Sequence, residues 1–134
     1  MKTYFKYALC IIRHNRLLVL EEADNEFYLM PGGKPVPGET YAQALRRELK
    51  EELGIALDIK SLNRIGTFED LAAGDASARV KLELYTGNFQ GDLTPNAEVK
   101  RLVWFGKDDD QSRLAPVTRN KILPALRQKG LLSW

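Results

Sequence analysis

The sequence predicts an α/β fold in which a mixed β-sheet is flanked by two helices. Short apolar and aromatic runs separated by turn signals are typical of strands. Two segments, Thr40–Leu53 and Pro116–Gly130, instead carry apolar residues at helical spacing. The order of these segments, with strands before, between and after the helical patterns, indicates a single α/β domain over residues 1–134.

The N-terminal third is expected to supply three strands and an irregular loop. Tyr4–Arg13 is rich in apolar and aromatic residues, and the turn signal after it predicts a hairpin with Leu17–Leu20. Phe27–Met30 is expected to form a short third strand. The loop 31–38 has three prolines and three glycines, so its backbone is irregular but conformationally restricted.

The first helix has clear end signals. Thr40 is a good N-cap, Gln43 completes a capping box with it, and Gly54 is suited to the C-terminal end. The apolar residues that recur at helical spacing, and are therefore expected to be buried, are Ala42, Leu45, Leu49 and Leu53.

The remaining segments are expected to form three strands, a turn and the second helix. The strands are Leu62–Leu71, Ala78–Tyr85 and Val99–Phe105. Thr94-Pro95-Asn96 marks a turn before the last of them. In the second helix, Leu123 and Leu126 are expected to face inward, and Pro124 is expected to kink or delay the helix.

Composition limits the classes of protein. Apolar residues make up 44 % of the chain and charged residues 28 %, which is typical of a globular protein. The net charge of +2 is too small to favour nucleic-acid binding by bulk attraction. No apolar run has the roughly 18 residues of a membrane helix, and the N-terminus lacks a signal-peptide cleavage site. The lone Cys10 fits a reducing compartment, so the cytoplasm is the expected location.

Three acids share one face of the first helix. Glu48, Glu51 and Glu52 lie at i, i+3 and i+4, so their charges repel one another and at least one pKa should be raised. A divalent cation would remove this repulsion, and Mg²⁺ prefers such oxygen ligands. The alternative is a solvated helix face. The preceding Gly32 and Gly33 favour a ligand site, because their backbone can approach a phosphate closely. Lys34 adds a positive charge beside them.

The segment from Gly33 to Ile55 resembles the Nudix box of the Nudix hydrolases, in the MutT-like group. It reads GKPVPGETYAQALRRELKEELGI and matches every fixed position of that signature. The resemblance implies an α/β/α sandwich with a mixed central sheet, in which the box forms a loop and a helix.

The resemblance also implies roles for individual residues. Glu51 and Glu52 would be the leading metal ligands, joined by the backbone carbonyl of Gly32. Glu48 would be a ligand or the general base. Arg47 would orient a carboxylate through charge-assisted hydrogen bonds, with Glu39 as a structural partner. Gly33 and Lys34 would contact the substrate.

A further glutamate from a later loop is implied for MutT-like members. Glu98 is the best match for this additional ligand or base because it lies six residues before Trp104. The other acids considered for this position are Asp75, Asp92 and Glu69.

The implied activity is hydrolysis of a nucleoside diphosphate linked to another group, with Mg²⁺ or Mn²⁺ as cofactor. The leading hypothesis is a nucleoside triphosphate pyrophosphohydrolase that releases the monophosphate and pyrophosphate, acting on a small molecule as a monomer or homodimer. The alternatives are a nucleotide-sugar or dinucleotide pyrophosphatase and a non-catalytic nucleotide sensor. Specificity for 8-oxo-dGTP is not expected. The MutT-like enzymes that remove oxidised nucleotides have a basic residue at the end of the second strand, where this chain has Glu21-Glu22, and an amide that reads the base near the position of Thr118.

Overall fold

The computed structural model describes residues 1–134. Its strands and helices follow in the order β1 (Lys2–Leu9), β2 (Ile12–Arg13), β3 (Arg16–Glu22), β4 (Gly32–Gly33), α1 (Tyr41–Leu53), β5 (Ala56–Leu57), η1 (Ile59–Ser61), β6 (Asn63–Ala72), β7 (Asp75–Thr86), β8 (Phe89–Gln90), β9 (Val99–Phe105), η2 (Gln111–Arg113), η3 (Thr118–Ile122) and α2 (Leu123–Gln128).

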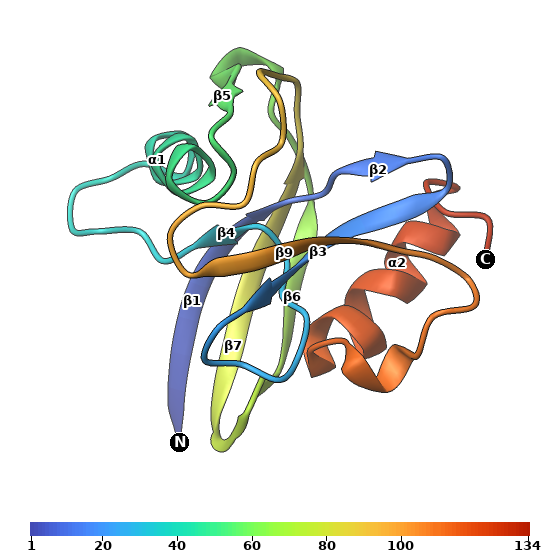
Figure 1. Ribbon diagram of the computed structural model, residues 1–134. Coiled ribbons are helices and arrows are strands. Elements are labelled where there is room, and N and C mark those ends of the chain that lie inside the picture. Colours follow the sequence, from blue (N-terminus) through green and yellow to red (C-terminus); the bar gives the residue numbers. More distant parts are fainter.

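The strands form a mixed sheet, an antiparallel sheet and one short pair. The mixed sheet has the order β4-β1-β7-β6, in which β1 runs parallel to β7 while the other neighbours are antiparallel. The second sheet has the order β2-β3-β9, and β5 pairs with β8. Helices α1 and α2 lie on opposite sides of these strands (Figure 1). The predicted α/β/α sandwich with a mixed sheet is therefore confirmed.

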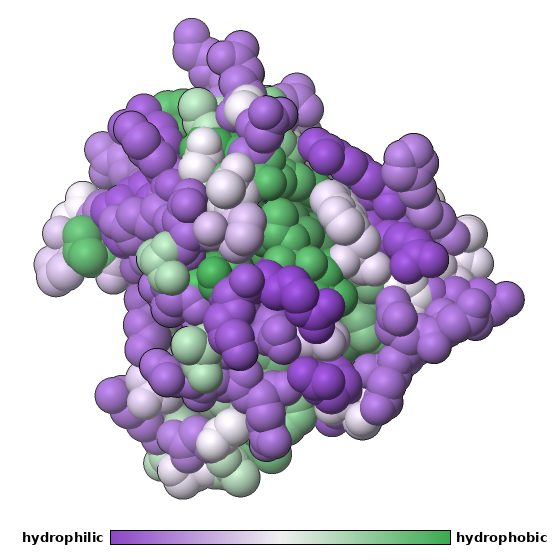
Figure 2. Space-filling view, in the orientation of Figure 1, coloured by the Kyte–Doolittle hydropathy of each residue, from purple (hydrophilic) through white to green (hydrophobic).

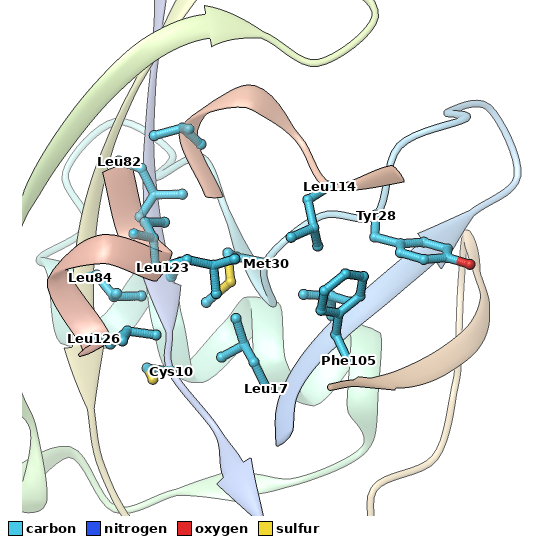
Figure 3. Packing of buried hydrophobic residues seen from close by; sticks show 14 of the residues in the cluster. Cys10, Leu17, Tyr28, Met30, Leu82, Leu84, Phe105, Leu114, Leu123 and Leu126 are labelled. Carbon is cyan, nitrogen blue, oxygen red and sulfur yellow. The ribbon is translucent and has the colours of Figure 1, made fainter. Parts of the chain in front are cut away.

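Strand β3 shows how one sequence supplies two cores. Leu17 and Val19 pack in the cluster that includes α2, whereas Leu18 and Leu20 pack in the cluster that includes α1, and all four are fully buried. Successive side chains of a strand point to opposite faces, so a continuous apolar run is what a strand covered on both faces requires. Figure 3 shows the α2 side of this packing, where Leu123 and Leu126 lie near Met30 and Leu82.

Helix α1 has the predicted ends. The side chain of Thr40 accepts a hydrogen bond from the Gln43 amide at 3.2 Å, and the Gln43 side chain accepts one from the Thr40 amide at 3.0 Å. Gly54 ends the helix with a φ of 69°, a left-handed conformation that glycine adopts without strain. The predicted apolar stripe is right except at its first position: Ala42 is only partly buried, and Ala44 is fully buried instead.

The C-terminal helix contains the disturbance expected from its proline. The chain becomes helical at Pro116, widens into the π-helical turn η3 and continues as α2, whose first turn contains Pro124. Proline has no N–H and its ring clashes with the carbonyl four residues earlier, so a wider turn before it relieves both conflicts. Leu123 and Leu126 are fully buried, as predicted.

Two predicted strands were wrong in detail. Tyr4–Arg13 is not one strand but β1 and β2, because the chain crosses from one sheet to the other: the Cys10 amide donates to Tyr85 on β7, and Ile11 accepts from Leu18 on β3. Phe27–Met30 makes only isolated bridges, since Tyr28 pairs with Leu114 and Leu29 pairs with Leu20. Each bridge joins a single pair of residues, which is too few to form a ladder.

The turn predicted at residues 94–96 lies instead directly after these residues. The amides of Thr94 and Asn96 donate to the carbonyls of Leu53 and Glu52, at 3.0 and 2.9 Å, so this segment is tied to the end of α1. The turn itself is at residues 97–98, where Ala97 has a φ of 53°. This attachment brings the residues before β9 next to the acidic end of α1.

The helices are all too short or too polar to cross a lipid bilayer, and α1 has only 13 residues. On the face shown in Figure 2, hydrophilic side chains border an apolar band that follows a hollow through the middle of the molecule. The helices therefore do not cover the whole apolar surface of the strand layers on this side.

Truncating the apolar stripe of α1 should destabilise the protein strongly. Leu49 is fully buried, so Leu49→Ala should lower the free energy of unfolding by about 2–5 kcal/mol through lost contacts and a residual cavity. Arg46→Ala, at an exposed position of the same helix, is the matched control and should change it by less than about 0.5 kcal/mol. Urea unfolding followed by circular dichroism measures both, and equal effects would contradict the assignment of the buried face.

Candidate active site

Carboxylates from three elements converge beside α1. Glu52 comes from α1, Glu22 from the end of β3 and Glu98 from the turn before β9, and one oxygen of each lies within 4.8 Å of the others. Antiparallel pairing of β3 with β9 explains the last two, because Glu22 is the partner of Val99 and the Ala23 amide donates to the Glu98 carbonyl at 3.2 Å. The end of one strand and the start of its partner must lie together in such a pair.

Glu52 is the most buried of these acids, with only 3 % of its surface exposed. One of its oxygens accepts a hydrogen bond from the Gly32 amide at 2.9 Å. Burial raises the pKa of Glu52 to about 8, the Gly32 N–H opposes this rise, and the negative charges of Glu22, Glu48 and Glu98 add to it. A carboxylate buried among other carboxylates fits a cation site, because a bound cation offsets both the burial and the repulsion.

Arg47 connects the loop before α1 to the acidic face. Its guanidinium donates to both oxygens of Glu39 at 2.8 and 2.9 Å, to Glu48 at 3.0 Å and to the Lys34 carbonyl at 3.1 Å. The hydrogen bonds from Arg47 and from the Val36 amide lower the pKa of Glu39 to about 2. Burial raises the pKa of Glu48 although Arg47 acts in the opposite direction. Arg47 thus holds Glu48 in place while the loop is held to the helix.

Glu51 occupies the outer margin of the acidic face. Its side chain is 56 % exposed, and its nearest cationic partner is Arg47 at 3.6 Å. It does not belong to the close group of Glu22, Glu52 and Glu98. Of the acids singled out in the sequence, the structure therefore brings Glu52 and Glu98 together directly, with Glu48 near them and Glu51 furthest out.

Two glycines of the loop make room for neighbouring groups of the protein itself. A Cβ on Gly32, whose φ is 139°, would lie 2.0 Å from the Tyr7 carbonyl oxygen, because β4 runs against β1. A Cβ on Gly33 would lie 2.4 Å from the carboxyl carbon of Glu48. The sequence explained both glycines by ligand approach, and the structure adds that they make room for a neighbouring strand and for an acid of the site.

Glu22 and Lys6 are the site residues that sequence reasoning missed. In the sequence, Glu22 indicates only substrate preference. Its position after one predicted strand, and that of Glu98 before another, becomes a signal once these two strands are paired. Burial raises the pKa of Glu22, and the nearby ammonium of Lys6 opposes the rise. Lys6 carried no signal in the sequence, because it is one lysine in a strand.

The acids considered as alternatives to Glu98 are engaged elsewhere. Glu69 forms an ion pair with Arg79 at 3.0 Å, and Asp75 accepts hydrogen bonds from Ser77. Asp92 is not a member of the close acidic group.

A cavity of about 260 Å³ lies on the α2 side of the mixed sheet, next to Lys6 and Lys34. Its lining is mainly apolar, with a few polar side chains, and consists of Tyr4, Lys6, Asn25, Leu29, Met30, Lys34, Ala72, Ala73, Asp75, Val80, Leu82, Ala115, Val117 and Thr118. Thr118 is fully buried, and its hydroxyl has no hydrogen-bond partner. An apolar cavity with a few polar groups is the usual form of a small-molecule site.

A comparison with family models decides the classification. The NUDIX domain model matches residues 4–126. The chain belongs to the NUDIX domain family. The match extends well beyond the box and includes Glu22 at the end of β3, Glu98 before β9 and all the residues that line the cavity, and the solved relatives described below agree with it. The chain is therefore classified with the Nudix hydrolases, a family that uses divalent metals and acts on small nucleotide compounds.

Individual relatives are similar over different lengths. A MutT-like protein of Streptomyces ambofaciens is 29 % identical over 86 % of this chain and 71 % of its own length. Human 8-oxo-dGDP phosphatase NUDT18 is 34 % identical over 44 % of this chain, but the match spans only 19 % of the human protein. The crystal structure of a MutT NUDIX hydrolase from Burkholderia pseudomallei superposes with a TM-score of 0.75 at 25 % identity, covering 96 % of this chain and 98 % of that one.

The buried acid of this Nudix domain should make metal-free stability depend on pH. The folded-state pKa of Glu52 is raised to about 8 from 4.5, so the folded protein binds an extra proton between these values, and this stabilisation is present below pH 4.5 and lost as pH rises to about 8. With EDTA present, the melting temperature of the wild type should fall from pH 5 to pH 8, and that of Glu52→Gln should fall less. Glu51→Gln, at the exposed position, is the control and should keep the wild-type slope. Identical slopes for all three proteins would contradict the assignment.

Proposed function

We propose that this protein hydrolyses nucleoside triphosphates with the help of a divalent cation, releasing the nucleoside monophosphate and pyrophosphate. The observation that carries the proposal is the group of acids around the buried Glu52, directly beside a mainly apolar cavity edged by lysines. The acids suit a cation with its phosphates, and the cavity suits the nucleoside attached to them. The intact set of box acids argues against a domain that only senses nucleotides.

The cation is Mg²⁺ in this proposal, with Mn²⁺ as a substitute. The residues that would hold it are the carboxylates of Glu48, Glu51, Glu52 and Glu98 and the carbonyl of Gly32. We include the carboxylate of Glu22 among them, because one of its oxygens lies within 4.8 Å of oxygens of Glu52 and Glu98. When bound, the cation supplies positive charge to the bridging and terminal phosphate oxygens. The raised pKa of Glu52 means that its deprotonation accompanies binding, so affinity for the cation should increase with pH.

The protein groups have separate tasks in the reaction. Water attacks one phosphorus of the substrate and its proton passes to a carboxylate of the site, while the bridging P–O bond between the first and second phosphates breaks and separates the monophosphate from pyrophosphate. Among Glu48, Glu52 and Glu98, Glu48 suits this role best, because Arg47 holds one of its oxygens and burial raises its pKa. Glu52 is tied to the Gly32 amide and is better suited to charge stabilisation. Gly33 and Lys34 lie where the phosphates would bind. Arg47 holds the loop and Glu48 in place through its hydrogen bonds to both.

The cavity is proposed to receive the base and sugar. The hydroxyl of Thr118 is buried in the cavity wall and has no partner within the protein, so it can donate a hydrogen bond to a base or accept one from it. The similar human protein is itself named for a nucleotide, 8-oxo-dGDP. We place the activity in the cytoplasm, because the single cysteine, Cys10, cannot form an internal disulfide and so fits a reducing compartment.

A substrate panel tests the proposal. Purified protein with Mg²⁺ is incubated with canonical and oxidised nucleoside triphosphates, ADP-ribose, nucleotide sugars and dinucleotides, and products are separated by ion-exchange chromatography. Monophosphate and pyrophosphate from a triphosphate, at the highest kcat/KM of the panel, is the expected result. Faster turnover of ADP-ribose or a dinucleotide would replace the proposal with the nucleotide-sugar or dinucleotide alternative. Nucleotide binding without any turnover would indicate a sensor.

Loss of the buried acid should abolish most of the activity. Glu52→Gln should lower kcat by at least about 10²-fold, the scale expected when one charge contact to the transition state is lost. Glu21→Gln is the control, because Glu21 pairs with Arg101 at 3.2 Å outside the close acidic group, and it should stay within about threefold of wild type. Near-normal turnover by Glu52→Gln would exclude the proposed role.

Glu22 should contribute to cation binding. We expect Glu22→Gln to weaken Mn²⁺ binding by about tenfold or more, since it removes one negative charge from the close acidic group. Titration of free Mn²⁺ followed by electron paramagnetic resonance gives the dissociation constant. Glu21→Gln again serves as the neighbouring control. Equal affinity of the Glu22 variant and the control would place the cation away from Glu22.

A further inference from the structure

Two lysines lie where the cavity meets the acidic group. Strand β1 pairs with β4 at Tyr7–Gly33 and Ala8–Gly32, so Lys6 and Lys34 are the next residues on the two segments beyond this short ladder. Both side chains line the cavity. Lys6 is partly buried, and its charge acts on the carboxyl of Glu22. The lysine pair therefore lines the cavity directly beside the ladder that contains Gly32 and Gly33.

Neither lysine forms an ion pair within the protein. The six ion pairs of the structure include neither Lys6 nor Lys34. The Lys34 ammonium lies over the face of the Tyr4 ring, at 3.9 Å from its centroid. Two unpaired ammonium groups at the edge of an apolar cavity repel each other, and an anion between them removes that repulsion.

The charge pattern of the site has a place for such an anion. The carboxylates would hold the cation at one end, while the mainly apolar cavity at the other end is lined by two cationic side chains, Lys6 and Lys34, and one acid, Asp75. The acids at the end of β3 would by themselves repel a phosphate chain. Lys6, on a different strand, brings positive charge to the same region.

We propose that Lys6, together with Lys34, binds the phosphate group nearest the nucleoside and is a specificity-determining residue for nucleoside polyphosphates. This inference rests on the proposed function, since it assigns the nucleoside to the cavity and the outer phosphates to the cation. Lys6 acts by positioning: it keeps the phosphate chain in line between the two parts of the site and takes no proton in the reaction.

The test is a comparison of three variants on strand β1. Lys6→Met should raise KM for the best triphosphate substrate by about tenfold or more with kcat within about threefold, because a charged hydrogen bond to substrate is lost while the acids stay intact. Lys6→Arg keeps the charge and should restore KM to within about threefold. Lys2→Met is the matched control: Lys2 lies on the same strand and face, over the same Tyr4 ring, but does not line the cavity, so its KM should equal that of wild type.

The outcomes separate this inference from the proposed function. A wild type that hydrolyses triphosphates together with an unchanged KM for Lys6→Met, or equal effects of the Lys6 and Lys2 variants, would overturn the inference alone. A loss of kcat in Lys6→Met that Lys6→Arg does not restore would indicate a structural role and also overturn it. If the wild type hydrolyses no triphosphate, the proposed function fails, and calorimetric binding of a non-hydrolysable triphosphate then decides: weaker binding by Lys6→Met supports the lysine site, and equal binding overturns it. Lys34→Met provides the same comparison if Lys6→Met does not fold.

Discussion

The docking of α1 against the strands is the constraint on which the rest of the site depends. Its leucines are fully buried, and this packing carries Glu52 into a position where only 3 % of its surface is exposed. A carboxylate would not be buried there for its own sake, since burial raises its pKa to about 8. Apolar packing of the helix offsets that cost, and the Gly32 amide supplies the one hydrogen bond that the acid receives from the backbone.

The loop before α1 is fitted to this arrangement from two directions. Gly32 allows β4 to lie against β1, and Gly33 leaves space for the Glu48 carboxylate. Arg47 then connects Glu39, Glu48 and the loop carbonyl of Lys34 through four hydrogen bonds. Because each contact restricts its neighbours, the box acts as one preorganised unit in which charged groups do not have to move before they can meet a ligand.

The strand layers join two halves of the site that use different chemistry. The α1 side contributes acids, and the α2 side contributes an apolar cavity with the hydroxyl of Thr118. The π-helical turn that accommodates Pro124 begins at Thr118, so the same backbone irregularity that satisfies a proline also presents this hydroxyl. Lys6 on β1 is shared by the two halves, because it lines the cavity and its positive charge acts on Glu22.

Local patterns were sufficient for the box and for most elements. Helix α1, its capping box, its C-terminal glycine and strand β9 were predicted from residue types and spacing, because the interactions that define them lie within a few residues. The sequence by itself therefore determined the family, the α/β/α sandwich and the acids of the helix. Only the tertiary structure decided that the first apolar run splits between two sheets, that Glu22 joins Glu52 and Glu98, and that Lys6 lies at the edge of the cavity. These features depend on which strand pairs with which and in what register. The three acids, for example, lie 30 to 76 positions apart in the sequence, and such distant contacts leave no periodic trace in the segments that make them.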